Sequence, residues 1–487
     1  MRFSITIALI LVLSAVGLTY EIAAGRVLAP FFGTSLLTWT TVIAIVLAGF
    51  SLGSALGGLI AENPRDVALG QVRWALVASA ALMAVSPAFL GVVHALGARG
   101  TAGMVISVFL VFFPASVFIT MPSPFLAKLA IEARPGREGS SLGFVLAAGS
   151  IGAIFGAIIA GFVALPLIGS TATFAACGVV ALLCLPFLRG ARDQKPSDEA
   201  GGPNTVVTLA AAGFVGFAGL AGTPVCQFES GLSCLHVVQR DGTVRLYSDG
   251  TTQAAETLSP SNTDGALTLA YTRWIWQRID RDLPKASAVL FVGGGGYSLP
   301  TQLLAADPDA TAVAVEIDPL VTDVVRQNLP RAAVMIQQVG YEAPDAPLGS
   351  GRLGIVHADG RIFINETTAR FDAAVMDAFS SGSVPAHLAT LETYQRLKTI
   401  TDGPVYINLI DQPDGRLVRG VHAILAELYP HIIAISGPTG REGRANQLLA
   451  ASDTPLAPLS GLPEGYFRFE VSEGQVFTDD RGWVGHR

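Results

Sequence analysis

Hydrophobic residues form long uninterrupted runs in the first half of the chain and short runs between polar turns in the second half. A helix needs about 20 apolar residues to cross a bilayer. Seven segments come close to this requirement, and most of them carry no charge: 3–28, 36–61, 74–98, 101–126, 142–167, 171–188 and 206–225. The pattern predicts a multi-pass α-helical membrane bundle of about seven helices over residues 1–225.

Small residues recur four positions apart in two of these segments, an arrangement that lets helix backbones approach closely. The two series are Gly49, Gly53 and Gly57, and Gly152, Gly156 and Ala160. We expect both faces to be sites of close helix packing.

Prolines and charges interrupt the apolar pattern at two places. Pro114, Pro122 and Pro124 predict that the fourth segment is kinked or partly re-entrant. Glu21 and Arg26 lie near the end of the first segment. They are interpreted either as a pair at the membrane surface or as an ion pair inside the membrane with a function, because charges in lipid are costly.

Basic residues are concentrated in alternate loops, which the positive-inside rule places in the cytoplasm. These residues are Arg65, Arg73, Lys128, Arg134, Arg137, Arg189, Arg192 and Lys195. With seven complete spans, the second half of the chain would emerge outside, away from a cytosolic nucleotide. Either segment 206–225 does not cross, or the second half is extracytoplasmic. The chain is expected in the cell (inner) membrane, with the side of its soluble half left open.

Composition and charge narrow the choice of partners. Only 14% of residues are charged, against about 25% in a typical soluble domain. The net charge of -7 leaves no basic stripe, so no nucleic-acid partner is expected. No His/Cys cluster has metal-ligand spacing, so no metal is expected. Cys177 and Cys184 are interpreted as core residues, whereas Cys226 and Cys234 are able to form a disulfide in an oxidising compartment.

Residues 286–487 alternate strands with helices, a pattern typical of a parallel α/β sheet. An apolar strand at 288–292 ends in Gly293, Gly294, Gly295 and Gly296, and a helix is predicted at 298–306. Glycines at the first strand-to-helix turn let the backbone approach a ligand closely. Glu316 ends the next strand, 312–315, where its carboxylate can accept hydrogen bonds from two ribose hydroxyls.

Two further strand ends carry acidic residues. Strand 353–357 leads to Asp359 and Gly360, and strand 371–376 leads to Asp377. The carboxyl ends of strands in an open α/β sheet line the ligand crevice, so Glu316, Asp359 and Asp377 are expected to converge there. A helix N-cap is the alternative role for either aspartate. The Ser-, Gly- and Pro-rich segment 378–385 is expected to form a loop over the site.

The crevice fits either NAD or an adenosyl sulfonium, and the single glycine turn favours the sulfonium. Segments 432–436 and 447–450 suit a sheet that ends in an antiparallel strand. The predicted fold is therefore a multi-pass α-helical membrane bundle plus an α/β Rossmann-like domain of the S-adenosylmethionine methyltransferase type. A small β segment with a linking helix, residues 226–285, precedes that domain.

Several sequence motifs occur in order along both halves of the chain. In the first half they are the run beginning YEIAAGRVLAPFFG and GSIGAIFGAIIAGFVALPLIGS. In the second half they are LYSDGTTQ, VLFVGGGG, VAVEIDPLV, VHADGRIFI, RFDAAVMDAFSSGSVPAHLATLETYQRLK and FTDDRGWV. Together these motifs resemble those of membrane-fused spermidine synthase-like proteins of the polyamine aminopropyltransferase family, and the resemblance covers nearly the whole chain.

The resemblance implies roles for particular residues. Gln253 and Glu316 would contact the methylthioadenosine portion of the donor, and Asp359 with Gly360 would hold the adenine edge. Asp377 matches the family's catalytic acidic residue, whose carboxylate takes a proton from the attacking amine. The implied donor is decarboxylated S-adenosylmethionine or S-adenosylmethionine itself, without a metal, and the implied acceptor is a small-molecule amine. A homodimer is left open.

The chain departs from the family pattern on the acceptor side. Gly296 and Tyr297 stand where the family's glycine loop runs into an aspartate, and Ser380 replaces a second aspartate after Asp377. Three functions are therefore compared. They are an aminopropyltransferase-like enzyme in the lipid bilayer, a methyltransferase acting on a lipid or an amine, and a transporter or sensor that binds a nucleotide without catalysis.

Overall fold

The structure is a computed structural model, and it describes residues 2–32, 36–188, 201–222, 224–258, 267–342, 351–378, 385–440 and 443–480. The chain divides into two compact units, Met1–Cys234 and Leu235–Arg487. Ser380, most of the predicted loop 378–385, and the basic residues Arg189, Arg192 and Lys195 lie outside the described residues.

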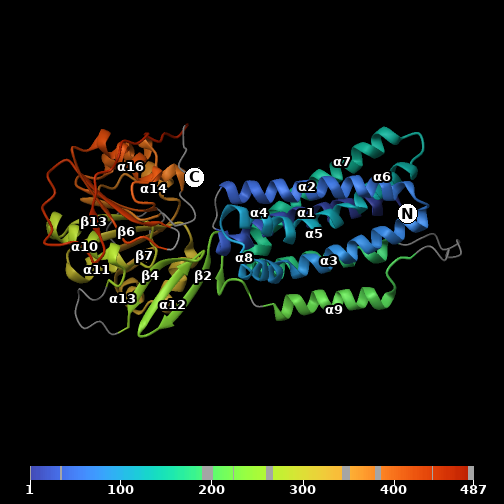
Figure 1. The fold of residues 1–487 in the computed structure, drawn as a ribbon, viewed down its shortest axis with the longest axis horizontal. Coiled ribbons are helices and arrows are strands. Elements are labelled where there is room, and N and C mark those ends of the chain that lie inside the picture. The colour runs from blue at the N-terminus through green and yellow to red at the C-terminus, as the bar shows by residue number, and fades with distance from the viewer. Residues whose placement is uncertain are drawn as a thin grey trace. The chain divides into compact units, whose positions relative to one another are not determined.

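The first unit is built from apolar helices (Figure 1). Helices α1 (Phe3–Phe32), α2 (Leu36–Glu62) and α3 (Arg65–Ala95) are long. The fourth predicted span is divided into α4 (Gly100–Val111), α5 (Phe113–Thr120) and α6 (Pro122–Glu132). Pro114 and Pro122 stand in the first turns of α5 and α6, where a missing N–H is tolerated, so the prolines begin new helices.

The following apolar run, Glu138–Phe187, contains α7 (Glu138–Ile158), the π-helix η1 (Ile159–Ala164), α8 (Leu165–Leu183) and the short η2 (Leu185–Phe187). A straight helix of 50 residues would measure about 75 Å, more than twice the thickness of the hydrocarbon core of a bilayer. Gly169, with φ 74° and ψ 174°, breaks the run between the predicted segments 142–167 and 171–188.

Five helices among the described residues are long and apolar enough to cross a membrane, which is compatible with a multi-pass membrane protein. The seventh predicted segment forms α9 (Thr205–Ala221), a shorter apolar helix of 17 residues. At 1.5 Å per residue α9 measures roughly 26 Å, slightly less than the hydrocarbon core.

Close helix packing occurs at both predicted glycine series. A Cβ atom at Gly53 would collide with Val117 of α5, and one at Gly57 would collide with the carbonyl of Met121. Gly152 and Gly156 of α7 approach the α1 backbone in the same way, at Leu11 and Ala15 respectively. Only glycine allows these backbone contacts, so the small-residue faces set which helices are neighbours.

Glu21 and Arg26 do not pair with each other, so that prediction is wrong. Arg26 Nε lies 3.9 Å from Glu229 Oε1, and Glu229 Oε2 accepts hydrogen bonds from the backbone N–H and hydroxyl of Ser170. Glu21 Oε2 is buried and has no hydrogen-bond partner among the described residues. Residues five apart on a helix point in different directions, which separates the two side chains.

Cys226 and Cys234 form a disulfide, with their Cα atoms 5.2 Å apart. The bridge closes the segment that follows α9. Cys177 and Cys184 are free and buried, in agreement with their predicted place in the core.

The small β segment is a four-stranded sheet in the order β1-β2-β3-β4. Its strands are β1 (Phe228–Glu229), β2 (Cys234–Arg240), β3 (Thr243–Ser248) and β4 (Thr251–Thr257). Asp241-Gly242 and Asp249-Gly250 make the two hairpin turns, and all four residues have positive φ. Asp-Gly pairs favour such turns, whose twist matches that of the strands. The linking helix is α10 (Ala270–Asp282).

The large sheet has nine strands in the order β13-β11-β12-β10-β9-β5-β6-β8-β7. Its parallel part contains β5 (Ala288–Val292), β6 (Thr311–Glu316), β7 (Gly340–Glu342), β8 (Leu353–His357), β9 (Ala373–Met376) and β10 (Val405–Asp411). Strand β12 (Ala445–Ser452) is antiparallel to both β10 and β11 (His431–Ser436), and β13 (Phe467–Arg468) pairs with β11. The predicted methyltransferase-type mixed sheet is thereby confirmed.

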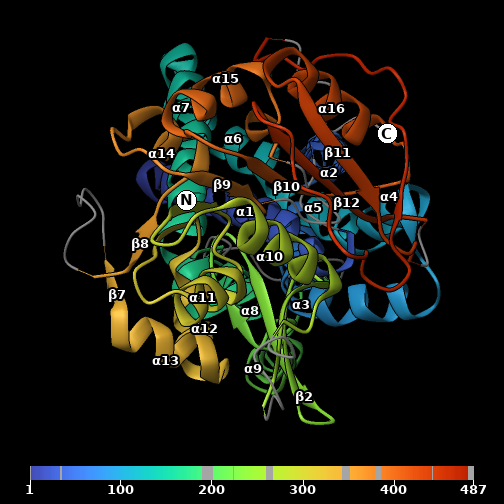
Figure 2. The ribbon, with the colours of Figure 1, turned by 90° about the vertical axis from the view of Figure 1, so that its left-hand side faces the viewer.

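Helices cover both faces of this sheet (Figure 2). Helices α10, α11 (Ser298–Ala306), α12 (Pro319–Asn328) and α13 (Pro330–Val339) lie on one face. Helices α14 (Gly360–Glu366), α15 (Leu391–Ile400) and α16 (Arg416–Leu428) lie on the other, with the 3-10 turn Ala386–Leu388 before α15. The core beneath the second group contains Tyr394, Leu397 and Val421, none of which is exposed. This packing holds the carboxyl ends of β9, β5, β6 and β8 side by side.

Candidate active site

The glycine turn connects the end of β5 to the start of α11. Gly293 has φ +100°, and a Cβ atom there would collide with the backbone carbonyl of Asp377. A Cβ atom at Gly294 would lie only 2.9 Å from the Cβ of Glu316. Glycine permits both the positive φ and the close approaches. The turn therefore lies directly between the ends of β9 and β6.

Glu316 is buried at the end of β6, with 8% of its surface exposed. Its Oε2 accepts the N–H of Gly295 at 3.0 Å, and its Oε1 accepts the N–H of Asp318 at 3.1 Å. Burial raises the pKa of Glu316 to about 7, against the lowering effect of these hydrogen bonds. Each carboxylate oxygen keeps a second lone pair, so the predicted bonds to ribose hydroxyls remain available.

Asp377 directly follows β9 and is held from three sides. Its N–H donates to the carbonyl of Val292 at 2.8 Å. Its Oδ1 accepts from Asn408 Nδ2 at 2.7 Å, and its Oδ2 accepts from the hydroxyl of Tyr271 at 3.1 Å. Burial raises the pKa of Asp377 to about 6, and the hydrogen bonds from Asn408 and Tyr271 partly oppose this rise. A carboxyl with this pKa is ionised at neutral pH and is still able to take up a proton.

Strand β4 lies over the glycine turn and explains one departure from the family pattern. The side chain of Glu256 on β4 accepts the N–H groups of Arg331 (2.9 Å) and Ala332 (3.1 Å) at the start of α13, which anchors the strand. The Cβ of Ala254 then fills the space that any side chain at Gly296 would need. An aspartate at that position does not fit without a shift of β4.

The next residue, Tyr297, has φ 56° and is buried. Its hydroxyl is 2.7 Å from Thr322 Oγ1, which is 3.0 Å from His357 Nε2. Tyr297 is therefore a packing residue behind the turn and does not supply the charge that an aspartate would.

A cavity lies over the turn, on the side of Asp377. Its lining is Gln253, Tyr271, Thr272, Phe291, Gly293, Gly294, Gly295, Gly296, Ser298, Leu299, Pro300, Val375 and Asp377. Four residues predicted as donor-binding, Gln253 and the first three glycines, thus share one cavity with the predicted base. Glu316 borders the same turn through its bond to Gly295.

Asp359 has the capping role that was the alternative to ligand binding. Its Oδ1 accepts the N–H groups of Arg361 (2.8 Å) and Ile362 (3.2 Å) at the start of α14. Its Oδ2 lies 2.9 Å from His387 Nε2. Gly360 packs closely, since a Cβ there would be 2.6 Å from Val292 Cγ1. Binding of the adenine edge by Asp359 stays a prediction.

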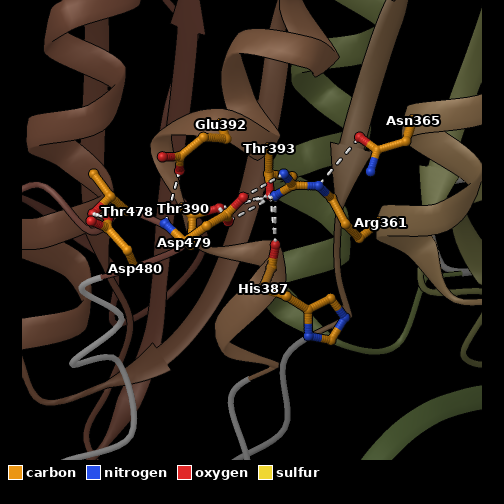
Figure 3. A network of polar contacts seen from close by, with 9 residues as sticks. All are labelled: Arg361, Asn365, His387, Thr390, Glu392, Thr393, Thr478, Asp479 and Asp480. Atoms are coloured by element: carbon orange, nitrogen blue, oxygen red, sulfur yellow. Dashed lines mark hydrogen bonds and ion pairs between the residues drawn. The ribbon is translucent and has the colours of Figure 1, made fainter.

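A polar network next to Asp359 ties the C-terminal segment to α14 and α15 (Figure 3). Arg361 Nη2 donates to Asp479 Oδ2 at 2.9 Å, and Arg361 Nη1 donates to the carbonyl of His387 at 3.1 Å. Asp479 also accepts the hydroxyl of Thr390 at 2.8 Å, and its N–H donates to Glu392. Asp479 belongs to the motif FTDDRGWV, so the described part of that motif holds the turn that carries His387.

The sequence did not identify Tyr271, Asn408 or His387 as site residues. Asn408 could have been found from the sequence, because it is a lone amide in the apolar strand VYINLID. Ile407 pairs with Met376 in the sheet, so the next residues of the two strands, Asn408 and Asp377, are also neighbours. Tyr271 and His387 come from the start of α10 and the turn before α15, and no strand-end rule points to them.

The described residues contain no group of three or more His, Cys, Asp or Glu side chains that could hold a metal ion.

Comparison with known proteins finds a match between residues 269–408 and the family model described as "Spermine/spermidine synthase domain". The match includes the glycine turn, Glu316, Asp359 and Asp377. The second unit therefore carries a spermidine synthase-like domain, and the match indicates a transferase with a polyamine-related function. No curated protein matches the chain.

Two solved spermidine synthase structures are similar to this chain at low identity. A probable spermidine synthase from Corynebacterium glutamicum is 20% identical over 53% of this chain and 97% of its own, with a TM-score of 0.43. Spermidine synthase from Thermotoga maritima is 17% identical over 53% and 85%, with a TM-score of 0.32. Human methyltransferase-like protein 13, in complex with SAH, is 23% identical over 40% and 86%, with a TM-score of 0.29.

Proposed function

We propose that this protein is a membrane-tethered transferase that moves an alkyl group from an adenosyl sulfonium donor to an amine. The observation that carries the proposal is a cavity formed jointly by the glycine turn and Asp377. The turn offers a close backbone approach to a nucleotide, and the carboxylate stands beside it as a base. The matched spermidine synthase domain supports the same chemistry.

The reaction needs only one proton transfer, from the attacking amine to the protein. The amine nitrogen donates its lone pair to the carbon next to the sulfonium sulfur. The bond between that carbon and sulfur breaks, and its electrons go to sulfur, which leaves as a neutral thioether. The thioether needs no acid, whereas the amine must lose a proton, so one carboxylate suffices. Asp377 is the base, with Asn408 and Tyr271 holding both of its oxygens in place.

The residues around the turn fit an adenosyl group. Gly293 and Gly294 leave no side chain between the strand ends. Glu316 accepts hydrogen bonds from the ribose, Gln253 contacts the methylthioadenosine portion, and Asp359 with Gly360 borders the adenine. Five long apolar helices in the first unit hold the enzyme in the bilayer.

Methyl transfer from ordinary S-adenosylmethionine is the second candidate, and Gly296 is the observation that favours it. The methyl donor carries a carboxylate beside its ammonium, so its tail has no net charge. The decarboxylated donor has only the ammonium, whose positive charge needs a carboxylate from the protein. Because Ala254 closes the space at Gly296, no carboxylate faces the donor tail from that position.

One experiment tests the proposal and separates the two donors. The purified full-length protein is titrated with decarboxylated and with ordinary S-adenosylmethionine in the presence of mixed small amines, and products are identified by mass spectrometry. Transfer of an aminopropyl or a methyl group to an amine supports the proposal and names the donor. Absence of binding by both donors contradicts it.

A further inference from the structure

The charges around the cavity restrict the acceptor beyond its being an amine. Among the described residues that line the cavity, Asp377 is the only one with a carboxyl group. The other polar lining residues, Gln253, Tyr271, Thr272 and Ser298, are uncharged. The remaining lining is glycine or apolar, including Phe291, Leu299, Pro300 and Val375.

We infer that the acceptor of this site carries one amine and no second cationic group. This inference rests on the proposed function and specifies its substrate class. The expected acceptor is an amine whose remaining part is apolar or neutral.

Positive and negative charges must balance within the cavity. The sulfonium donor brings one positive charge next to the transferred carbon, and the Asp377 carboxylate compensates it. The reacting amine must be neutral to attack, so it adds no charge at that stage. A diamine would bring a further ammonium group, which has no carboxylate partner among the described lining residues. Burying an unpaired ammonium is costly even after local relaxation.

The packing around the turn blocks one obvious source of a second carboxylate. A side chain at Gly296 would collide with Ala254, whose strand is anchored by Glu256. Tyr271 does not substitute for a carboxylate, because burial and the neighbouring Asp377 charge hold its pKa well above the usual value. Tyr271 therefore remains neutral and donates its hydrogen bond to Asp377.

The inference is tested by competition between two acceptors of matched length. The full-length protein, with a saturating donor that it turns over, receives putrescine and butylamine at equal concentrations, and both products are quantified by mass spectrometry. We expect kcat/KM for butylamine to exceed that for putrescine by more than about tenfold, because only putrescine carries an unpaired cation into the cavity.

A designed carboxylate provides the matched gain-of-function control. Ser298 lines the cavity and begins α11, where an acidic side chain is favourable at the helix N-terminus. Ser298→Asp is expected to raise kcat/KM for putrescine by about tenfold or more relative to butylamine. Ser298→Asn has the same shape without the charge and is expected to keep the original preference.

Two outcomes overturn the inference, and they are distinguishable from each other. A wild-type preference for putrescine refutes the single-amine acceptor while leaving the proposed transfer intact. If neither donor binds, the proposed function is refuted, and the inference falls with it.

Discussion

Removing the Asn408 amide should change the pH dependence of catalysis, because that amide stabilises the charged form of Asp377. Asn408 Nδ2 donates to Asp377 Oδ1 at 2.7 Å, and this hydrogen bond lowers the pKa of Asp377. Without it, less opposes the rise in pKa that burial causes. A hydrogen bond to a charged group contributes about 1.5–3 kcal/mol, and 1.36 kcal/mol corresponds to one pKa unit. Asn408→Leu should therefore raise the pKa of Asp377 from about 6 by roughly one to two units.

The assay is kcat/KM for donor turnover between about pH 5 and pH 9, which reports the pKa of the base in the free enzyme. Asp377 acts when ionised, so activity falls as the pH drops through its pKa. In the wild type the fall is expected near pH 6, and in Asn408→Leu it moves to higher pH. Asn446→Ala is the control, because Asn446 donates to Asn408 Oδ1 at 2.9 Å without touching Asp377. A folded Asn408→Leu enzyme whose profile stays at the wild-type position would refute the assigned base.

Three further predictions concern the donor site, the helix packing and the side of the membrane. Glu316→Ala should weaken methylthioadenosine binding by about 1.5–3 kcal/mol, and unchanged affinity by calorimetry would remove the ribose contact. Gly53→Leu should destabilise the detergent-solubilised protein by about 1–3 kcal/mol in thermal unfolding, because α5 fills the space that the new side chain needs. Gly58→Leu is the control and should not destabilise it, because nothing lies within 4 Å of a Cβ atom there. Equal effects of the two substitutions would count against the packing. If α9 completes a crossing, the basic loops place the second unit outside the cytoplasm, where the Cys226–Cys234 disulfide is stable, and maleimide should label these cysteines in intact membranes only after reduction. Labelling before reduction would favour the cytoplasmic side.

The side of the membrane has a direct consequence for function. An extracytoplasmic second unit would exclude a cytosolic polyamine synthase, and both substrates would have to be present outside. A cytoplasmic second unit would require that α9 does not complete a crossing. The labelling experiment therefore decides which compartment supplies the donor.

Strand-end residues were predictable because their signals are local. The apolar run 288–292 stops at a glycine turn, and Glu316 and Asp377 each stop the apolar run of a strand. Parallel strands bring such positions to one edge of the sheet, so the sequence could place Glu316 and Asp377 near the turn before any contact was known. The breaks of the fourth apolar segment were predictable for the same reason, because the prolines that cause them lie at the breaks themselves.

Contacts between distant segments were not predictable in this way. Arg26 pairs with Glu229, from the segment after the last apolar helix, and no spacing rule connects the two. The orientation of Asp377 depends on Tyr271 and Asn408, which come from separate elements. The sequence also did not explain why position 296 is a glycine, because the explanation is the packing of Ala254 on β4 against that position.

The central claim is that Asp377 is the base of a transfer from an adenosyl sulfonium to an amine, and Asp377→Asn tests it most directly. The substitution keeps the shape of the side chain and removes its basicity. Donor affinity is measured by calorimetry, and transfer is measured by mass spectrometry in a single turnover with the donor and acceptor of the wild-type reaction. We expect donor affinity to be nearly unchanged and the transfer rate to fall by about 10²–10⁴-fold, the usual contribution of a general base. Transfer by Asp377→Asn at the wild-type rate would contradict the account.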